Sequence, residues 1–274
     1  MTRVHSSRRG STLALVLWTL VVAGGVSLAV STRSRSAIAV ASNARAHAIA
    51  RYAAESGLTI AVRAIEESLS VVADSGARAA LLNTLPRAPF PLPGGILGAA
   101  RMALAISDES SKLDLNYADA DAVAQLLSEF GDAGAARRTA AAIRAHIGTG
   151  VTPDSPDESF PIGQSTAGTA FWSSRGARYL TSLDDLMAIP DVDLQLLERA
   201  APYFTVDGDG TTNRATAPAA VLRAASGALV DSPNRLLLVS RGWLEGSSLT
   251  HEIQAVYAVQ GNNLDLVRWR ERTR

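Results

Sequence analysis

Two clusters of acidic side chains are the part of this sequence best suited to chemistry. The first is the stretch DGDGTTN, in which Asp207, Asp209 and Asn213 gather oxygen atoms along a glycine-rich turn. Carboxylate and amide oxygens are the ligands that Ca²⁺ takes in proteins. The stretch lacks the glutamate that closes an EF-hand loop at its twelfth position. It therefore indicates either a calcium site in a simpler turn or a set of solvated loop acids.

The second cluster consists of Asp154, Asp157 and Glu158. These residues lie in 148–178, which is polar and carries Gly, Ser, Thr and Pro throughout, a composition that predicts a long loop. Calcium is thus the one candidate cofactor, with the six acidic and amide residues of both clusters as candidate ligands. Solvated loop acids are the alternative here as well.

Catalytic chemistry finds little support in the sequence. No cysteine is present, which excludes disulfides, thiolate metal sites and a cysteine nucleophile. The four histidines, His5, His47, His146 and His251, are not within chelating distance of one another along the chain, and no G-x-S-x-G stretch occurs. We expect a protein that is not an enzyme.

Nucleic-acid binding is also disfavoured. The 26 basic side chains are balanced by 26 acidic ones, so no bulk positive field attracts phosphate. Residues 183–200 have the outline of a helix-hairpin-helix, a module that often binds DNA phosphates. Its hairpin carries Asp191 and Asp193 in place of glycines, which puts two carboxylates where a phosphate would sit.

The element on which the whole chain depends is its first apolar run. Residues 11–31 carry no charge and, at about 1.5 Å per residue, would form a helix of about 31 Å, enough to cross a membrane. A basic head, Met1 to Gly10, precedes it. The large apolar side chains expected in the membrane are Leu13, Leu15, Leu17, Trp18 and Leu20.

Three interpretations of this N-terminus compete. A cleaved secretory signal has a shorter apolar core of roughly 7–15 residues. A plain membrane anchor fits the length, although arginines flank the run on both sides and give weak asymmetry. The third is a prepilin-type leader, cut after Gly10 so that Ser11 becomes the new N-terminus.

The helix is predicted to continue far beyond the membrane. Residues 37–73 contain no proline, and Leu58, Val62, Ile65 and Leu69 recur at spacings of four, three and four, which is one face of an amphipathic helix. Gly76 is predicted to end it, before a proline-rich loop. Secretory signals do not usually run directly into the longest helix of a mature domain, so this pattern favours the leader.

The remaining chain is predicted to form short elements. Their ranges are a strand at 101–107, helices at 120–130, 135–147, 182–186 and 193–200, and three strands at 235–240, 249–260 and 264–270. Residues 212–218 resemble 113–119, with Asn213 opposite Asp114, which predicts a repeated turn into a helix. The architecture expected is α+β: a long helix on a four-stranded antiparallel sheet, with an inserted helical subdomain.

Together these segments resemble one family, the type II secretion minor pseudopilin known as general secretion pathway protein K (GspK), over nearly the whole chain. The matching segments are Arg9-Gly10, Leu17-Trp18, Ala53 to Gly57, Asp108 to Asn116, Ser182 to Leu186 and Thr212 to Pro218. The segment from Asp108 to Asn116 is the most specific. Residues 213–217 and the acidic loop depart from the family pattern, which weakens a calcium site carried over by resemblance.

The resemblance implies a pilin-like fold and a role in assembly. The domains implied are a leader at 1–10, a membrane and assembly helix at 11–31, a pilin-like part at 32–111, a helical insertion at 112–226 and C-terminal strands at 227–274. Most pilin-like subunits carry glutamate five residues after the cut. Leu15 stands there in this chain, as expected for a subunit at the tip that docks beneath no other.

The implied partners are the I and J minor pseudopilins, the major pseudopilin, the inner-membrane assembly platform and the prepilin peptidase, whose cut would leave Ser11 as a methylated N-terminus. The protein would sit in the bacterial inner membrane with its globular part in the periplasm and help to export folded proteins across the outer membrane. The alternative is an uncleaved single-pass inner-membrane protein with a periplasmic calcium- or ligand-binding domain.

Overall fold

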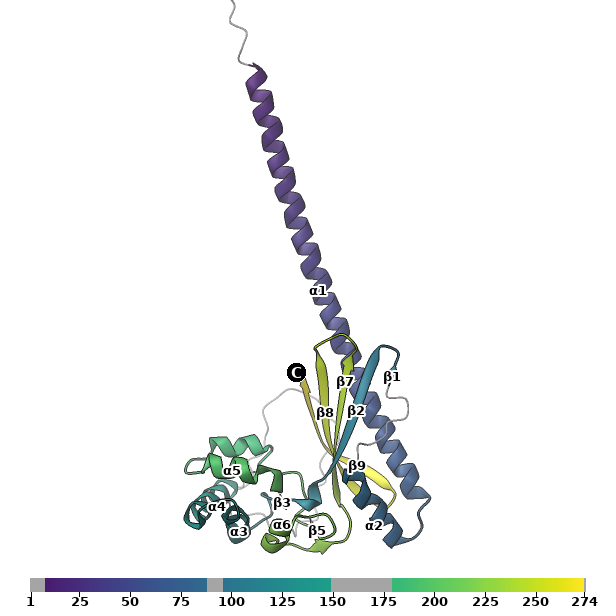
Figure 1. The fold of residues 1–274 in the computed structure, drawn as a ribbon, viewed down its shortest axis with the longest axis vertical. Coiled ribbons are helices and arrows are strands. Elements are labelled where there is room, and N and C mark those ends of the chain that lie inside the picture. Colours follow the sequence, from purple (N-terminus) through teal and green to yellow (C-terminus); the bar gives the residue numbers. More distant parts are fainter. Residues whose placement is uncertain (1–7, 88–95, 149–178, 274) are drawn as a thin grey trace, which may run out of the picture.

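The computed structural model describes residues 8–87, 96–148 and 179–273. One helix projects far from a body made of a sheet and a group of short helices (Figure 1). The helix is α1, Arg8–Ser70, 63 residues without a break. Within the described residues it alone is long and apolar enough to cross a membrane. Leu13, Leu15, Leu17, Trp18 and Leu20 are all exposed along its free part, as the sequence predicts for a membrane segment.

The helix ends earlier than the sequence predicts. It stops at Ser70, and Gly76 does not terminate it but lies in the first turn of a separate helix, α2 (Ser75–Thr84). The side chain of Asp74 accepts a hydrogen bond from the Ala77 N–H and caps α2. The 3₁₀ turn η1 (Leu85–Arg87) follows α2. The prediction was wrong because the capping aspartate, two residues before Gly76, starts a new helix.

Within the part of the chain that the structure describes, the sheet has five antiparallel strands rather than the four expected. Its order is β1-β2-β7-β8-β9. The bounds are Ile96–Leu97 for β1, Ala100–Asp108 for β2, Arg235–Leu244 for β7, Thr250–Gln260 for β8 and Asn263–Thr273 for β9. The additional strand, β1, is only two residues long. The three C-terminal strands are predicted correctly in place, but β7 and β9 extend beyond their predicted ends.

The lower half of α1 packs on one face of this sheet. Of the predicted stripe, Leu58, Ile65 and Leu69 are buried there against the strand core around Leu236, and Val62 is half-buried. Closer to the N-terminus of α1, the contact with the sheet is made by Ala50, Ala53 and Ala54, which are also buried. The abundance of alanine in α1 thus has a structural reason: small side chains allow the helix backbone to lie close to the strands.

Between β2 and β7 the chain forms a second, separate hydrophobic core. Its buried residues run from Leu113 to Ala224. The elements are η2 (Glu109–Ser111), β3 (Leu113–Asp114), α3 (Ala120–Ser128), α4 (Ala133–Ile147), η3 (Leu183–Ala188), α5 (Leu194–Ala200), η4 (Ala201–Tyr203), β4 (Phe204–Thr205), β5 (Thr212–Asn213), α6 (Ala219–Ala224) and β6 (Leu229–Val230). The long helix, antiparallel sheet and helical insertion confirm the expected α+β class.

Local capping chemistry explains where the helices of the insertion begin. Asp119, Asp132 and Asp193 each accept a hydrogen bond from a main-chain N–H three residues later, at the starts of α3, α4 and α5. Ser182 and Asp185 form a reciprocal capping box at the start of the helix predicted at 182–186, which is the 3₁₀ helix η3.

Candidate functional site

The insertion leaves the sheet at the end of β2 and returns at the start of β7, two neighbouring strands. At this point Ser110 Oγ accepts hydrogen bonds from the main-chain N–H groups of Asn234 (3.0 Å) and Arg235 (3.2 Å). We use the term "junction" for the buried polar residues around this crossing. They are Asp108, Glu109, Ser110, Asp114, Asn116, Thr205 and Asn213.

Asp108, at the end of β2, is the centre of the junction. Its Oδ1 accepts a hydrogen bond from the Ser110 N–H (2.8 Å), and its Oδ2 accepts one from Asn213 Nδ2 (2.8 Å) and one from Thr216 Oγ1 (2.5 Å). Burial raises the pKa of Asp108, and these hydrogen bonds oppose that rise. Oδ1 therefore fixes the turn into η2, and Oδ2 joins β2 to the segment around β5.

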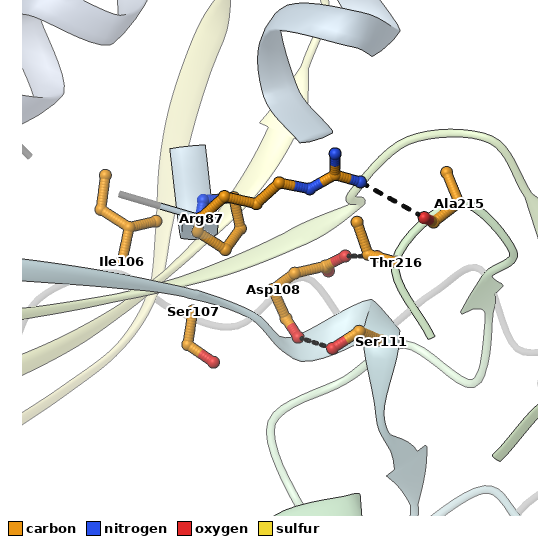
Figure 2. A pocket seen from close by; sticks show the side chains of 8 residues that line it. Arg87, Ile106, Ser107, Asp108, Ser111, Ala215 and Thr216 are labelled. Carbon is orange, nitrogen blue, oxygen red and sulfur yellow. Dashed lines mark hydrogen bonds between the residues drawn. The ribbon is translucent and has the colours of Figure 1, made fainter. Parts of the chain in front are cut away.

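A small pocket of about 290 Å³ opens beside Asp108. Figure 2 shows Arg87 reaching across it to the carbonyl of Ala215, at 3.5 Å, with Asp108 and Thr216 beneath. Ser111 Oγ donates to the Asp108 carbonyl at 2.7 Å. Arg87, Ser111 and Thr216 thus all bond other groups of this pocket, so its geometry indicates a structural contact between the body and the insertion.

Two further residues of the segment 108–116 bond distant parts of the insertion. Glu109 accepts from Lys112 Nζ (2.6 Å) and, through its other oxygen, from Thr205 Oγ1 (2.5 Å). Asn116 donates to the carbonyls of Leu180 and Val206 (both 3.1 Å) and accepts from the Leu180 N–H (2.9 Å). The most specific motif of the sequence is thus a set of buried hydrogen-bonding residues that fixes the insertion.

The two segments that resemble each other in sequence adopt the same turn. Asp114 Oδ1 accepts from the Asn116 N–H at 2.8 Å, and Asn213 Oδ1 accepts from the Ala215 N–H at 3.1 Å. The main-chain carbonyls of the two residues accept from Ala118 and Ala217, at 2.8 and 2.9 Å. Each turn follows a two-residue strand and precedes a helix, α3 or α6. The predicted correspondence is confirmed.

Of the predicted calcium ligands, Asp154, Asp157 and Glu158 lie outside the described residues. Asp207 and Asp209 lie in the loop after β4, but their carboxylates are engaged. Arg268 and Arg270 bind Asp207, and Asp209 accepts from Thr211 and Asn234.

The third candidate of that cluster, Asn213, is fully buried and donates through its amide to Asp108 and Asn83, both at 2.8 Å. No group of three or more acidic or histidine side chains in the described parts of the chain is arranged to hold a metal ion. Calcium binding stays a prediction.

Asp114 is the acidic residue at the junction whose role the sequence does not indicate. It is 5% exposed, and its Oδ2 has no hydrogen-bond partner within the described part of the chain. Burial raises its pKa to about 7, and the nearby carboxylates of Asp207 and Asp209 add to the rise. A methyl group built on Gly208 would lie 2.7 Å from that oxygen, so Gly208 allows the loop to close over Asp114.

The arginines that bind Asp207 are also absent from the sequence-based candidates. Arg268, Arg270 and Arg272 alternate along β9, which places them on one face of the strand. That alternation was the available signal. The alternation does not show what these arginines bind, because Asp207 lies in the insertion, about 60 residues earlier in the chain.

Comparison with known proteins gives a likeness in structure alone. No family model matches the sequence, and no curated protein matches it. A chain of the crystal structure of the GspK-GspI-GspJ complex from the enterotoxigenic Escherichia coli Type 2 Secretion System superposes with a TM-score of 0.58 at 13% identity. The match covers 85% of this chain and 99% of that chain. The chain therefore has the pilin-like fold found in that complex, with a long N-terminal helix on an antiparallel sheet.

Proposed function

We propose that this protein is a minor pseudopilin of the GspK type, which forms the tip of a type II secretion pseudopilus and helps to start its assembly. The observation that carries the proposal is the superposition over 99% of a chain of the GspK-GspI-GspJ complex. The uninterrupted 63-residue helix adds to it, because α1 begins before Gly10 and continues into the body. A long helix that leaves the membrane and continues into the body suits a pilin-like subunit, which keeps its apolar run after the leader is removed.

The free part of α1 supports assembly with similar helices. Four exposed alanines, Ala37, Ala41, Ala44 and Ala48, continue the spacing of four and three residues that buries the stripe 58–69 lower on the helix. A repeat of 3.5 residues is the spacing at which two helices remain in contact along their length. Small side chains allow close approach of the helix axes. The partners proposed are the I and J minor pseudopilins and the major pseudopilin.

The helical insertion supports a position at the tip. It has its own core, at the far end of the body from the free part of α1 (Figure 1), and we propose 112–226 as its boundaries. A subunit that carries this additional bulk would obstruct another subunit stacked above it. Leu15, in place of the usual glutamate, suits a subunit that docks beneath no neighbour. The body would then lie in the periplasm and α1 in the inner membrane.

Processing at Gly10 is the sharpest test of the proposed function. We expect mass spectrometry of the membrane-extracted protein to find Ser11, methylated by the prepilin peptidase, as the N-terminus. Replacing Gly10 with leucine should block the cut and abolish export of folded substrates in a strain that depends on this subunit. Gly24→Ala is the matched control, because a methyl group there meets no atom within 4 Å.

An intact Met1 in the wild-type protein, with normal export by Gly10→Leu, would contradict the proposal. That outcome would favour the second candidate, an uncleaved single-pass membrane protein with a periplasmic ligand-binding domain. The single membrane-length helix in the described residues favours this candidate equally. The state of the N-terminus therefore separates the two.

A second prediction concerns the alanine face of α1. Ala41→Phe should reduce co-purification with co-expressed I and J subunits about tenfold, since overpacking a close contact costs about 1–3 kcal/mol. Ala39→Phe is the control: Ala39 is also exposed but lies about 160° around the helix from Ala41. Equal recovery of the partners with both variants would show that this face makes no close helix contact.

A further inference from the structure

Strand β9 places two guanidinium groups on one carboxylate of the insertion. Arg270 binds Asp207 through two hydrogen bonds, both 2.9 Å, and Arg268 Nη1 lies 2.5 Å from Asp207 Oδ1. The Asp207 side chain is 7% exposed. A bidentate arginine pair with a nearly buried carboxylate is among the stronger polar contacts in proteins. These bonds join the sheet directly to the loop after β4.

The same two arginines bind a second segment of the insertion. Arg268 Nη1 and Arg270 Nη2 donate to the main-chain carbonyl of Thr181, at 3.2 and 2.5 Å. Thr181 belongs to the turn that is held by Asp185 at the start of η3. The pair therefore fastens two parts of the insertion to β9, at a place separate from the chain crossing at Ser110.

We propose that Arg268 and Arg270 form a clamp that takes the place of a divalent cation at the acidic loop 207–213 and fastens the helical insertion to the sheet. The inference does not depend on the role in secretion. In this inference, two arginine side chains of β9 neutralise and hold the acidic residues of the loop, as a bound calcium ion would otherwise do. The attachment of the insertion at this loop is then independent of calcium.

The ligand geometry supports the clamp over a cation. Ca²⁺ requires about six to eight oxygen ligands at about 2.3–2.6 Å. Both oxygens of Asp207 face guanidinium nitrogens, and Asp209 is held by Thr211 and Asn234. Two guanidinium groups already lie against the one carboxylate of Asp207, so an added dication would bring further positive charge to a largely buried place.

The test is thermal unfolding of the purified full-length chain in detergent, in EDTA and in millimolar CaCl₂. The double variant Arg268→Gln/Arg270→Gln should melt about 4–8 °C below wild type in EDTA, because it loses charge-assisted hydrogen bonds. Arg272→Gln is the matched control on the same face of β9, since Arg272 Nη2 lies 3.8 Å from Asp184 Oδ2 and both side chains are well exposed. This variant should have the same melting temperature as the wild type.

The calcium series separates the clamp from a cation site. We expect CaCl₂ to leave the melting temperature of the wild type unchanged. A rise of equal size in the wild type and in Asp207→Asn would assign that rise to calcium binding at another site. A calcium-dependent rise that disappears in Asp207→Asn would overturn the clamp, as would equal melting of the double variant and Arg272→Gln. If the double variant does not fold, the single variants Arg268→Gln and Arg270→Gln decide, and each should lower the midpoint by a smaller amount.

Discussion

Replacing Gly242 with valine is expected to lower the melting temperature of the protein by about 10 °C, the result of at least about 3 kcal/mol of lost stability. Gly242 lies in β7 directly beneath α1. A Cβ at this position would be 2.2 Å from the Ala50 carbonyl oxygen and 2.5 Å from the Ala54 nitrogen. Both are backbone atoms of one helix, so no side-chain rotation can relieve the contact.

The helix would have to move away from the sheet to admit the new side chain. That movement would loosen the hydrogen bond from Ser240 Oγ to the Ala54 carbonyl (2.7 Å) and the packing of Gly57 on Ser240. It would also separate the apolar face around Leu58 from the strands. The loss therefore extends beyond one contact, and overpacked cores with fixed backbone lose the most stability.

Calorimetry of the purified chain measures this effect. Ala103→Val is the matched control, because Ala103 lies in the adjacent strand β2 on the exposed face of the sheet and accepts a branched side chain freely. The control should melt within a few degrees of the wild type. Equal melting of Gly242→Val and Ala103→Val would show that α1 does not approach β7 as closely as described.

Replacing Asp114 with asparagine is expected to stabilise the protein at pH 8 and to have almost no effect at pH 4. The folded-state pKa of Asp114 is raised from 3.8 to about 7, chiefly by burial. A raised carboxyl pKa means that the folded protein holds the proton more tightly than the unfolded chain. The stability that protonated Asp114 contributes is complete below pH 3.8 and is lost as the pH rises through about 7.

Asparagine mimics the protonated acid in shape and lacks the charge. At pH 8 it should add up to about 4 kcal/mol of stability, the size expected for a shift of about three pKa units. It keeps the hydrogen bond from the Asn116 N–H and removes repulsion from Asp207 and Asp209, at the loss of attraction from Arg268. Asp108, whose pKa is also raised, is unchanged in both proteins and cancels in the comparison.

Urea unfolding across pH 4–8 in EDTA gives the measurement, with the difference between variant and wild type plotted against pH. Asp119→Asn is a suitable control, because asparagine is equally able to cap α3 and Asp119 lies at a helix start rather than within the junction. At pH 8 its stability should be close to that of the wild type, because asparagine caps a helix as well as aspartate does. Destabilisation by Asp114→Asn at pH 8 would mean that the ionised carboxylate has a positive partner, and would contradict the expectation.

The sequence alone determines the elements whose causes are local. The apolar run and the stripe of Leu58 and Ile65 predict α1, since a helix is set by periodicity within a few turns. The caps formed by Asp119 and by the box of Ser182 and Asp185 are local in the same sense, because each acts on a main-chain group two or three residues away. Alternation and turn residues locate the three C-terminal strands.

The tertiary structure decides what depends on distant segments. Asn213 is read from the sequence as a loop ligand, yet it is buried against Asp108, 105 residues earlier in the chain. Asp207 is read as a cation ligand, yet it meets Arg268, 61 residues later. The amide and carboxylate chemistry is the same in either case. Which partner satisfies it is decided by the packing of the insertion on the sheet, because a buried polar group bonds whichever partner folding brings within reach.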